Sequence, residues 1–134
     1  MQNSPELHEI LYVSKLAADA PIRVIADIAV WSRSANRSRD ITGLLVFDGM
    51  HFCQQFEGGN TEVSELMERI RLDPRHTDIH ILHRGPLADR RFRQWSLGYT
   101  SVDDVEAVAR LEQLQGQAAV EAFMGMLPGL DLEG

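Results

Sequence analysis

The chain has 134 residues, of which 44% are hydrophobic and 25% are charged, and its formal net charge is −7. This length and balance predict one globular domain with a substantial core and exclude a disordered or fibrous chain. The negative charge argues against unspecific binding to nucleic acid or to an anionic membrane, because both surfaces would repel the chain.

Residues 1–8 are polar and contain a proline, so they are expected to form a flexible leader. A short strand is predicted from Glu9 to Ser14, where side chains alternate between two faces. A helix is predicted from Pro21 to Ser34, because apolar residues recur there at helical spacing and proline suits a first helical turn. The apolar run from Ile41 to Phe47 predicts a strand, and Asp48-Gly49 predicts a hairpin turn after it.

The second half of the chain begins with a strand that follows this turn and then a second amphipathic helix, which Asp73-Pro74 ends. Its apolar positions are Val63, Leu66, Met67 and Ile70. Two more strands are predicted, from Ile79 to His83 and from Trp95 to Thr100. The basic stretch between them, Arg84 to Arg93, is expected to be a loop with a turn at Gly85-Pro86.

Two helical stripes complete the chain, one from Val102 to Leu111 and one from Val120 to Leu127. The resulting order, βαββαββ followed by two helices, predicts an α+β fold with a ferredoxin-like sheet and two helices on one face. In that fold the third strand lies between the first and the second. Residues 9–100 would form the core and residues 101–134 a helical cap, which could cover the other face of the sheet or join two subunits in a homo-oligomer.

Gln54 is the misfit of this pattern, because Phe52, Gln54 and Phe56 share what looks like the buried face of one strand. A buried amide without partners costs about 1–3 kcal/mol, so a polar group should meet it there. Tyr12 in the first strand and Asn36 after the first helix are two further polar residues at unexpected positions.

Each of these three residues has an ordinary explanation when it is taken singly. The hydroxyl of Tyr12 could reach water, Gln54 could lie on a solvated edge, and Asn36 could cap a helix. Taken together, the phenol and the two amides could line one cleft. A heterocycle with donors and acceptors along one edge is the natural ligand for two amides, since each amide offers both.

Five blocks of sequence carry a resemblance to one known family. They are LYVS with Tyr12, NRSRDITGLL at 36–45, FCQQFEG at 52–58, DPRH at 73–76 and RFRQWSL at 91–97. Their order and approximate spacing over about residues 9–100 resemble the BLUF family, whose members are blue-light sensors that use flavin adenine dinucleotide (FAD). The resemblance implies a short photoreceptor that binds FAD non-covalently.

By this resemblance, Gln54 would bond the reactive nitrogen and carbonyl edge of the flavin. Tyr12 would bond Gln54 and donate an electron and a proton after illumination, while Asn36 would hold the pyrimidine edge. These roles would explain why an amide stands on the apolar face of the strand.

The same resemblance extends to the end of the second predicted helix. Arg69 and Asp73 lie one helical turn apart in a region that, in the family, reaches the flavin ring and ribitol, and His76 also matches the family pattern. An exposed charged pair and an exposed loop histidine are the alternatives for these residues.

Trp95 and Leu97 fall where family members commonly carry a tryptophan and a methionine on the last strand. The methionine of that pair approaches the glutamine and takes part in signalling. Leu97 can fill the space but offers no thioether acceptor, so altered recovery or output is expected while flavin binding is retained.

The leading hypothesis is therefore a photoreceptor without enzymatic activity, which signals through the last strand and the C-terminal helices to a separate, unidentified effector protein. One alternative is a binding or oligomerisation module with the same fold and no chromophore. A second is a small ferredoxin-like hydrolase, since one fold hosts many functions.

Other chemistry finds little support in the sequence. Cys53 is the only cysteine, so it can form neither an intrachain disulfide nor a cysteine cluster for zinc. His80 and His83 are expected on opposite faces of a strand, so no metal site is predicted. No apolar run approaches the roughly 18 residues of a membrane span, and a cytoplasmic location without direct nucleic-acid contact fits best.

Overall fold

A computed structural model describes residues 6–20, 24–93, 95, 97–101 and 106–129 of the chain. Its centre is a five-stranded sheet in the order β4-β1-β3-β2-β5. The strands are β1 (Leu7–Leu16), β2 (Thr42–Phe47), β3 (His51–Gly59), β4 (His76–Leu87) and β5 (Gly98–Ser101). β1 pairs antiparallel with β3 and β4, and β2 pairs antiparallel with β3 and parallel with β5.

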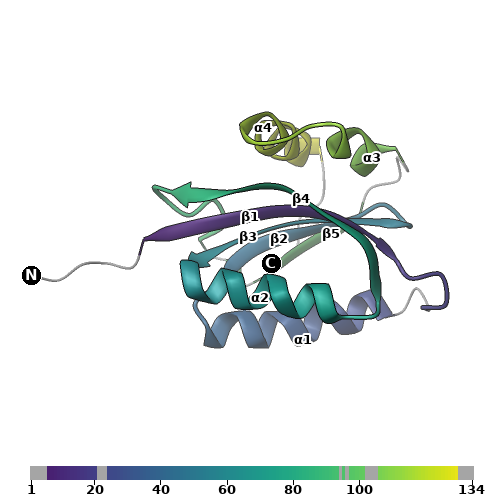
Figure 1. The fold of residues 1–134 in the computed structure, drawn as a ribbon, viewed down its shortest axis with the longest axis horizontal. Coiled ribbons are helices and arrows are strands. Elements are labelled where there is room, and N and C mark those ends of the chain that lie inside the picture. Colours follow the sequence, from purple (N-terminus) through teal and green to yellow (C-terminus); the bar gives the residue numbers. More distant parts are fainter. Residues whose placement is uncertain (1–5, 21–23, 94, 96, 102–105, 130–134) are drawn as a thin grey trace, which may run out of the picture.

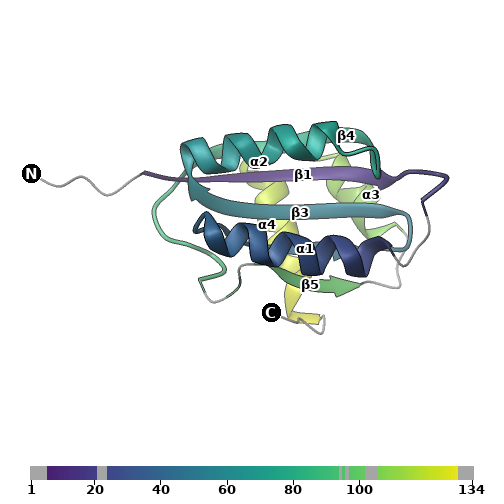
Figure 2. The same cartoon turned by 90° about the horizontal axis from the view of Figure 1, so that it is seen from below.

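Helices cover both faces of this sheet (Figure 1). On one face lie α1 (Val24–Ser38) and α2 (Asn60–Leu72), and both run along the direction of β1 and β3, as the view from below shows (Figure 2). On the reverse face lie α3 (Ala107–Glu112), α4 (Gln117–Met126) and the 3-10 turn η1 (Leu127–Gly129). The predicted α+β, ferredoxin-like fold is confirmed, including the position of the third strand between the first and the second.

Side-chain alternation along the strands divides the core between the two faces. On the α1/α2 face, Tyr12 and Phe56 pack with Met67 of α2, while Leu45 and Phe52 pack with Ile28 of α1. On the reverse face the neighbouring strand positions pack against α3 and α4, and the fully buried members there are Leu11, Val13, Leu44, Val46, Cys53, Val108, Ala119 and Phe123. The C-terminal helices therefore cover the sheet of their own chain.

Element boundaries differ from the predictions at two places in the first half of the chain. β1 begins at Leu7, inside the predicted leader. α1 continues four residues beyond Ser34, so Asn36 lies within the helix and not after it. The interpretation of Asn36 as a residue beyond the helix is therefore wrong, because the polar residues after Ser34 do not end the helix, which runs to Ser38.

The basic stretch predicted as a loop is partly strand. β4 runs to Leu87, and Pro86 pairs with His8 of β1. Proline is tolerated there because β4 is the edge of the sheet, where one side of the strand makes no ladder hydrogen bonds. β5 begins only at Gly98, so Trp95 and Leu97 precede the last strand instead of lying on it. The predicted stripe residues Val102 and Val105 fall outside the described residues.

Candidate functional site

Tyr12 and Gln54 form the centre of the site. They stand directly opposite each other on β1 and β3, and both side chains point toward α1 and α2. The phenol of Tyr12 donates a hydrogen bond of 2.6 Å to Oε1 of Gln54. Burial raises the pKa of Tyr12, so the phenol remains protonated and acts as the donor of this bond.

The other end of the Gln54 amide is open. Because Tyr12 takes up the carbonyl oxygen, the NH2 group of Gln54 remains as the donor side of the amide, and it makes no hydrogen bond to another described residue. Gln54 is nevertheless 6% exposed and lines a cavity. A ligand acceptor in that cavity would complete the hydrogen bonding of Gln54.

The cavity lies between α1, α2 and the sheet, and it combines apolar walls with a few polar groups. It is lined by Tyr12, Ile28, Ser32, Asn36, Leu45, Gln54, Leu66, Ile70, Asp73, Arg75, His76 and Leu97. Six residues predicted for the site thus meet in one place, although they come from five different parts of the chain.

Asn36 reaches the cavity from the last turn of α1 and is almost fully buried. Its backbone carbonyl accepts hydrogen bonds from the amides of Arg39 and Ile41, which fixes the end of the helix beside β2. Ser32, one turn earlier on the same helix, also lines the cavity and was not predicted. Its spacing of four residues from Asn36 was the available signal.

The far end of the cavity is closed by the turn after α2. Asp73 is the C-cap of α2 and binds the guanidinium of Arg75 through both carboxylate oxygens, with distances of 2.7 to 3.1 Å. Burial alone would raise the pKa of Asp73, but the hydrogen bonds and charge of Arg75 outweigh it and lower the pKa. Arg75 was not among the predicted site residues, although the DPRH block contains it.

His76 follows Arg75 and is buried against the rings of Tyr12 and Phe52. Its Nδ1 lies 3.0 Å from the hydroxyl of Ser14, two residues after Tyr12 on the same face of β1. Burial lowers the pKa of His76, while the nearby Asp73 opposes this shift. No local pattern singled out Ser14, because its partner is 62 residues away.

Arg69 has a different position from the other predicted residues. Its side chain is exposed on α2, and it is not among the residues that line the cavity. Arg69 and Asp73 are four residues apart but do not share a helix face. Asp73 lies in the turn after α2 and pairs with Arg75 instead.

Trp95 and Leu97 separate onto the two faces of the sheet. Leu97 is buried in the cavity beside the α1/α2 core, and its backbone carbonyl accepts a 2.8 Å hydrogen bond from Nε of Arg33. Trp95 packs on the reverse-face core and stacks on Phe92 with ring centroids 6.0 Å apart.

Comparison with known proteins identifies the family. The family model "BLUF: Sensors of blue-light using FAD" matches residues 7–98, which is more than half of the chain. The chain belongs to the BLUF family. It is a blue-light photoreceptor domain, as the resemblance of its sequence blocks implied.

Two BLUF relatives with curated functions are much longer than this chain. The chain is 34% identical over 86 residues to the "blue light- and temperature-regulated antirepressor BluF" of Escherichia coli (strain K12), which covers 64% of this chain and 21% of the relative. It is 33% identical over 97 residues to the "photoactivated adenylate cyclase subunit beta" of Euglena gracilis, with coverage of 69% and 11%. These BLUF proteins thus connect light to an antirepressor or a cyclase.

Solved BLUF structures share the fold. The dark-state structure of BlrB, a BLUF protein, has a TM-score of 0.71 and 35% sequence identity, and the match covers 81% of this chain and 83% of BlrB. A bacterial light-regulated adenylyl cyclase has a TM-score of 0.70 and 27% identity, and the match covers 80% of this chain and 33% of that one.

The lining of the cavity has the chemistry that the flavin of BLUF proteins would need. Ile28, Leu45 and Ile70 line it with apolar atoms, and the amides of Asn36 and Gln54 would face the pyrimidine edge of a bound ring. The open NH2 group of Gln54 is the specific sign of fit, since it needs an acceptor that no described residue provides.

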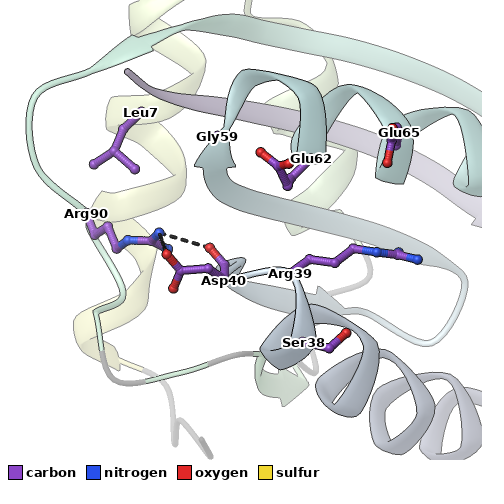
Figure 3. A pocket seen from close by; sticks show the side chains of 8 residues that line it. All are labelled: Leu7, Ser38, Arg39, Asp40, Gly59, Glu62, Glu65 and Arg90. Carbon is purple, nitrogen blue, oxygen red and sulfur yellow. Dashed lines mark hydrogen bonds and ion pairs between the residues drawn. The ribbon is translucent and has the colours of Figure 1, made fainter. Parts of the chain in front are cut away.

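A second hollow lies where α1 ends and α2 begins, and it holds none of the predicted BLUF site residues (Figure 3). Charges of both signs line it, including Arg39, Glu62 and Glu65. Arg90 is already bound there to Asp40 at 3.2 Å and to the hydroxyl of Thr42 at 2.9 Å. The basic stretch of the sequence is thus partly used to hold the fold together.

The described part of this BLUF chain contains neither a candidate metal centre nor a candidate membrane span. Among those residues, no group of three or more His, Cys, Asp or Glu side chains is arranged to hold a metal ion. No described helix is long and apolar enough to cross a membrane.

Proposed function

We propose that this photoreceptor responds to blue light by a relay between Tyr12 and Gln54 beside a non-covalently bound FAD. The support is the 2.6 Å bond from the phenol to the amide, together with the amide NH2 group that faces the cavity without a partner among the described residues. FAD would supply the absorption of blue light and an excited ring that accepts an electron.

Tyr12 would give up that electron and release its phenolic proton toward Oε1 of Gln54. Loss of the proton removes the donor that fixes the carbonyl end of the amide, so Gln54 becomes free to rotate or to change tautomer. When the electron and the proton return to Tyr12, the amide keeps the new arrangement. The output of light is therefore a change of hydrogen bonds and not a chemical product.

Asn36 and His76 would hold the cofactor during this cycle. Asn36 is fixed by the end of α1 and would bond the pyrimidine edge, while His76 is oriented by Ser14 and closes the cavity beside Tyr12. Asp73 would act mainly by orienting Arg75 toward the ribitol side. We assign Arg69 a contact only with the outer part of the dinucleotide, because its side chain is exposed.

We propose that the signal leaves through Leu97, Trp95 and the C-terminal helices toward a separate effector protein, and that the chain itself carries no enzymatic activity. Leu97 touches the cavity while Trp95 touches the core under α3 and α4, so this short segment joins the two faces. A cytoplasmic sensor fits the single buried cysteine and the acidic surface.

The deciding experiment is the visible absorption spectrum of the freshly purified protein in the dark, after blue illumination and during recovery. A flavin spectrum that shifts slightly to the red and then relaxes supports the proposal, and chromatography of the released chromophore tests FAD against shorter flavins. A colourless protein that takes up no added flavin overturns it in favour of a chromophore-free binding module.

A further inference from the structure

A buried cluster of polar side chains lies on the reverse side of β3, directly behind Gln54. It consists of Glu9 on β1, Gln55 and Glu57 on β3, and Arg91 in the segment after β4, and we call it the reverse-face cluster. Glu9, Gln55 and Glu57 are at most 1% exposed. Charged groups of this kind are rarely buried so completely unless they are paired.

Gln55 bridges the two carboxylates of the cluster. Its NH2 group donates to Oε1 of Glu9 at 3.1 Å and to Oε1 of Glu57 at 2.9 Å. Its own carbonyl oxygen is buried and has no hydrogen-bond partner among the described residues. The amide is locked in this orientation, because a flip would turn the carbonyl oxygen toward two carboxylates.

Glu57 holds the segment that leads to the last strand. Besides Gln55, its carboxylate accepts hydrogen bonds from the backbone amides of Arg91 at 2.9 Å and Phe92 at 3.0 Å, and from the hydroxyl of Thr42 at 2.7 Å. Arg91 adds a two-pronged bond to Glu9 with distances of 2.8 and 3.1 Å. The guanidinium of Arg91 is thus bound to β1, and the backbone of Arg91 and Phe92 is bound to β3.

This attachment continues to the residues beside the cavity. Phe92 stacks on Trp95, and the backbone carbonyl of Trp95 accepts a 3.1 Å bond from the amide of Gly43. Two residues further on, Leu97 enters the cavity that contains Gln54. Gln54 and Leu97 therefore line the same cavity. They are also linked on the reverse face of the sheet, through Gln55, the chain neighbour of Gln54, and its contacts with Glu57 and Phe92.

We propose that Gln55 and Glu57 are positioning residues that couple the light-driven movement of Gln54 to the Trp95 and Leu97 segment. A shift of the β3 backbone at Gln54 moves Gln55 as well, and the reverse-face cluster transmits the displacement to Arg91 and Phe92. Leu97 has an apolar side chain, and among the described residues β3 is joined to this segment by the hydrogen bonds that Glu57 accepts from Arg91 and Phe92. The inference rests on the proposed function, because it requires the light-driven change at Gln54.

The test compares Gln55→Met and Glu57→Gln with the unaltered protein and with Gln115→Met, a matched control at an exposed position. Gln55→Met keeps the side-chain volume but removes the bridge, while Glu57→Gln replaces two accepting oxygens with one. Each protein is illuminated, and both the flavin red shift and the hydrogen exchange of backbone amides in residues 91–101 are recorded in light and in darkness.

The unaltered protein and Gln115→Met should show a red shift and a light-dependent change of exchange in residues 91–101. Gln55→Met should keep the red shift, because Tyr12 and Gln54 are intact, while the exchange change falls below about half of its normal size. Glu57→Gln should reduce the light-dependent change of exchange in residues 91–101 further. If Glu57→Gln does not fold, Thr42→Val, which removes one donor to the same carboxylate, takes its place.

Unchanged light-dependent exchange in Gln55→Met, together with a normal red shift, would overturn the coupling role. A red shift in the unaltered protein without any exchange change in residues 91–101 would overturn it too. If the unaltered protein binds flavin but shows no red shift, the proposed function itself fails, so the two failures are distinguishable.

Discussion

Gln54 and Gln55 are neighbours in sequence and face opposite sides of one sheet, and their hydrogen bonds differ in kind. Gln54 accepts one bond from Tyr12 and presents its NH2 group to a cavity, whereas Gln55 donates both N–H groups to carboxylates of its own chain. On the α1/α2 face one amide donor thus has no partner among the described residues, whereas on the reverse face both amide donors bind carboxylates that hold the fold.

This difference shows how to separate a binding residue from a structural one. Burial alone does not, since both glutamines are buried. The distinction lies in whether the polar group borders a cavity and which of its atoms remain without a partner. Substitutions on the α1/α2 face should therefore affect the light response, and substitutions in the reverse-face core should affect stability.

The largest effect is expected for Gln54→Leu. The leucine removes both the acceptor of the Tyr12 proton and the donor toward the cavity, so flavin should stay bound while the light-induced red shift is abolished. Absorption spectra before and after blue light measure this directly. A shift of normal size in Gln54→Leu would exclude the relay.

Tyr12→Phe should also abolish the red shift, because phenylalanine keeps the ring in the core but lacks the hydroxyl that donates to Gln54. Flavin fluorescence should rise in this variant, since an electron donor next to the ring is lost. A normal photocycle would remove Tyr12 from the mechanism and leave Gln54 in need of another partner.

Substitutions in the reverse-face core should lower the free energy of unfolding and leave the flavin spectrum unchanged. Phe123→Ala on α4 removes a fully buried ring from the reverse-face core, and truncations of this kind cost about 3–5 kcal/mol of unfolding free energy. Urea denaturation measures the loss. Trp31→Ala, at a side chain that is 75% exposed, is the control and should change stability by less than about 0.5 kcal/mol.

Low pH should decrease the free energy of unfolding because His76 is buried. Because burial lowers its pKa from 6.5, the unfolded chain binds a proton at higher pH than the folded one, so this contribution to stability is lost as the pH falls below 6.5. One such proton changes the unfolding free energy by at most about 1.4 kcal/mol per pH unit. Asp73 and Arg75 face the ring and oppose each other in this shift.

Urea titrations just above and well below pH 6.5, on the normal protein and on His76→Gln, isolate the contribution of His76 to the free energy of unfolding. The difference in stability between the two proteins should shrink at the lower pH. A constant difference would show that His76 binds its proton equally in both states.

The smallest effect is expected for Leu97→Met. The side chains are similar in size, so binding and the red shift should persist, while dark recovery changes because a thioether can accept a weak hydrogen bond from Gln54. Recovery kinetics after a light pulse measure this. Identical kinetics would mean that leucine at this position is without consequence.

Much of the site could be read from the sequence because its signals are local. Alternation along β3 exposed Gln54 as a polar residue on an apolar face, and the order of strands and helices set Tyr12 beside it. The helical spacing of α2 also predicted its buried face correctly, with Val63, Met67 and Ile70 in the core.

What the sequence could not supply depends on contacts between distant segments. Ser14 meets His76 across 62 residues, and Glu9 meets Arg91 across 82, so no local pattern announces either pair. The basic stretch was predicted only as a loop for the same reason, since its partners Glu9, Asp40 and Glu57 come from other strands and turns.

The sequence by itself determined the fold class, because periodicity and residue type act over a few neighbouring residues, while the family and the roles of the central pair followed from the resemblance of five sequence blocks. Only the tertiary structure decided that Tyr12 and Gln54 share a register, that Asn36 lies within a helix, and that Trp95 and Leu97 face opposite sides. Register and packing depend on all strands together, since a slip of one residue would turn every side chain of a strand to the other face.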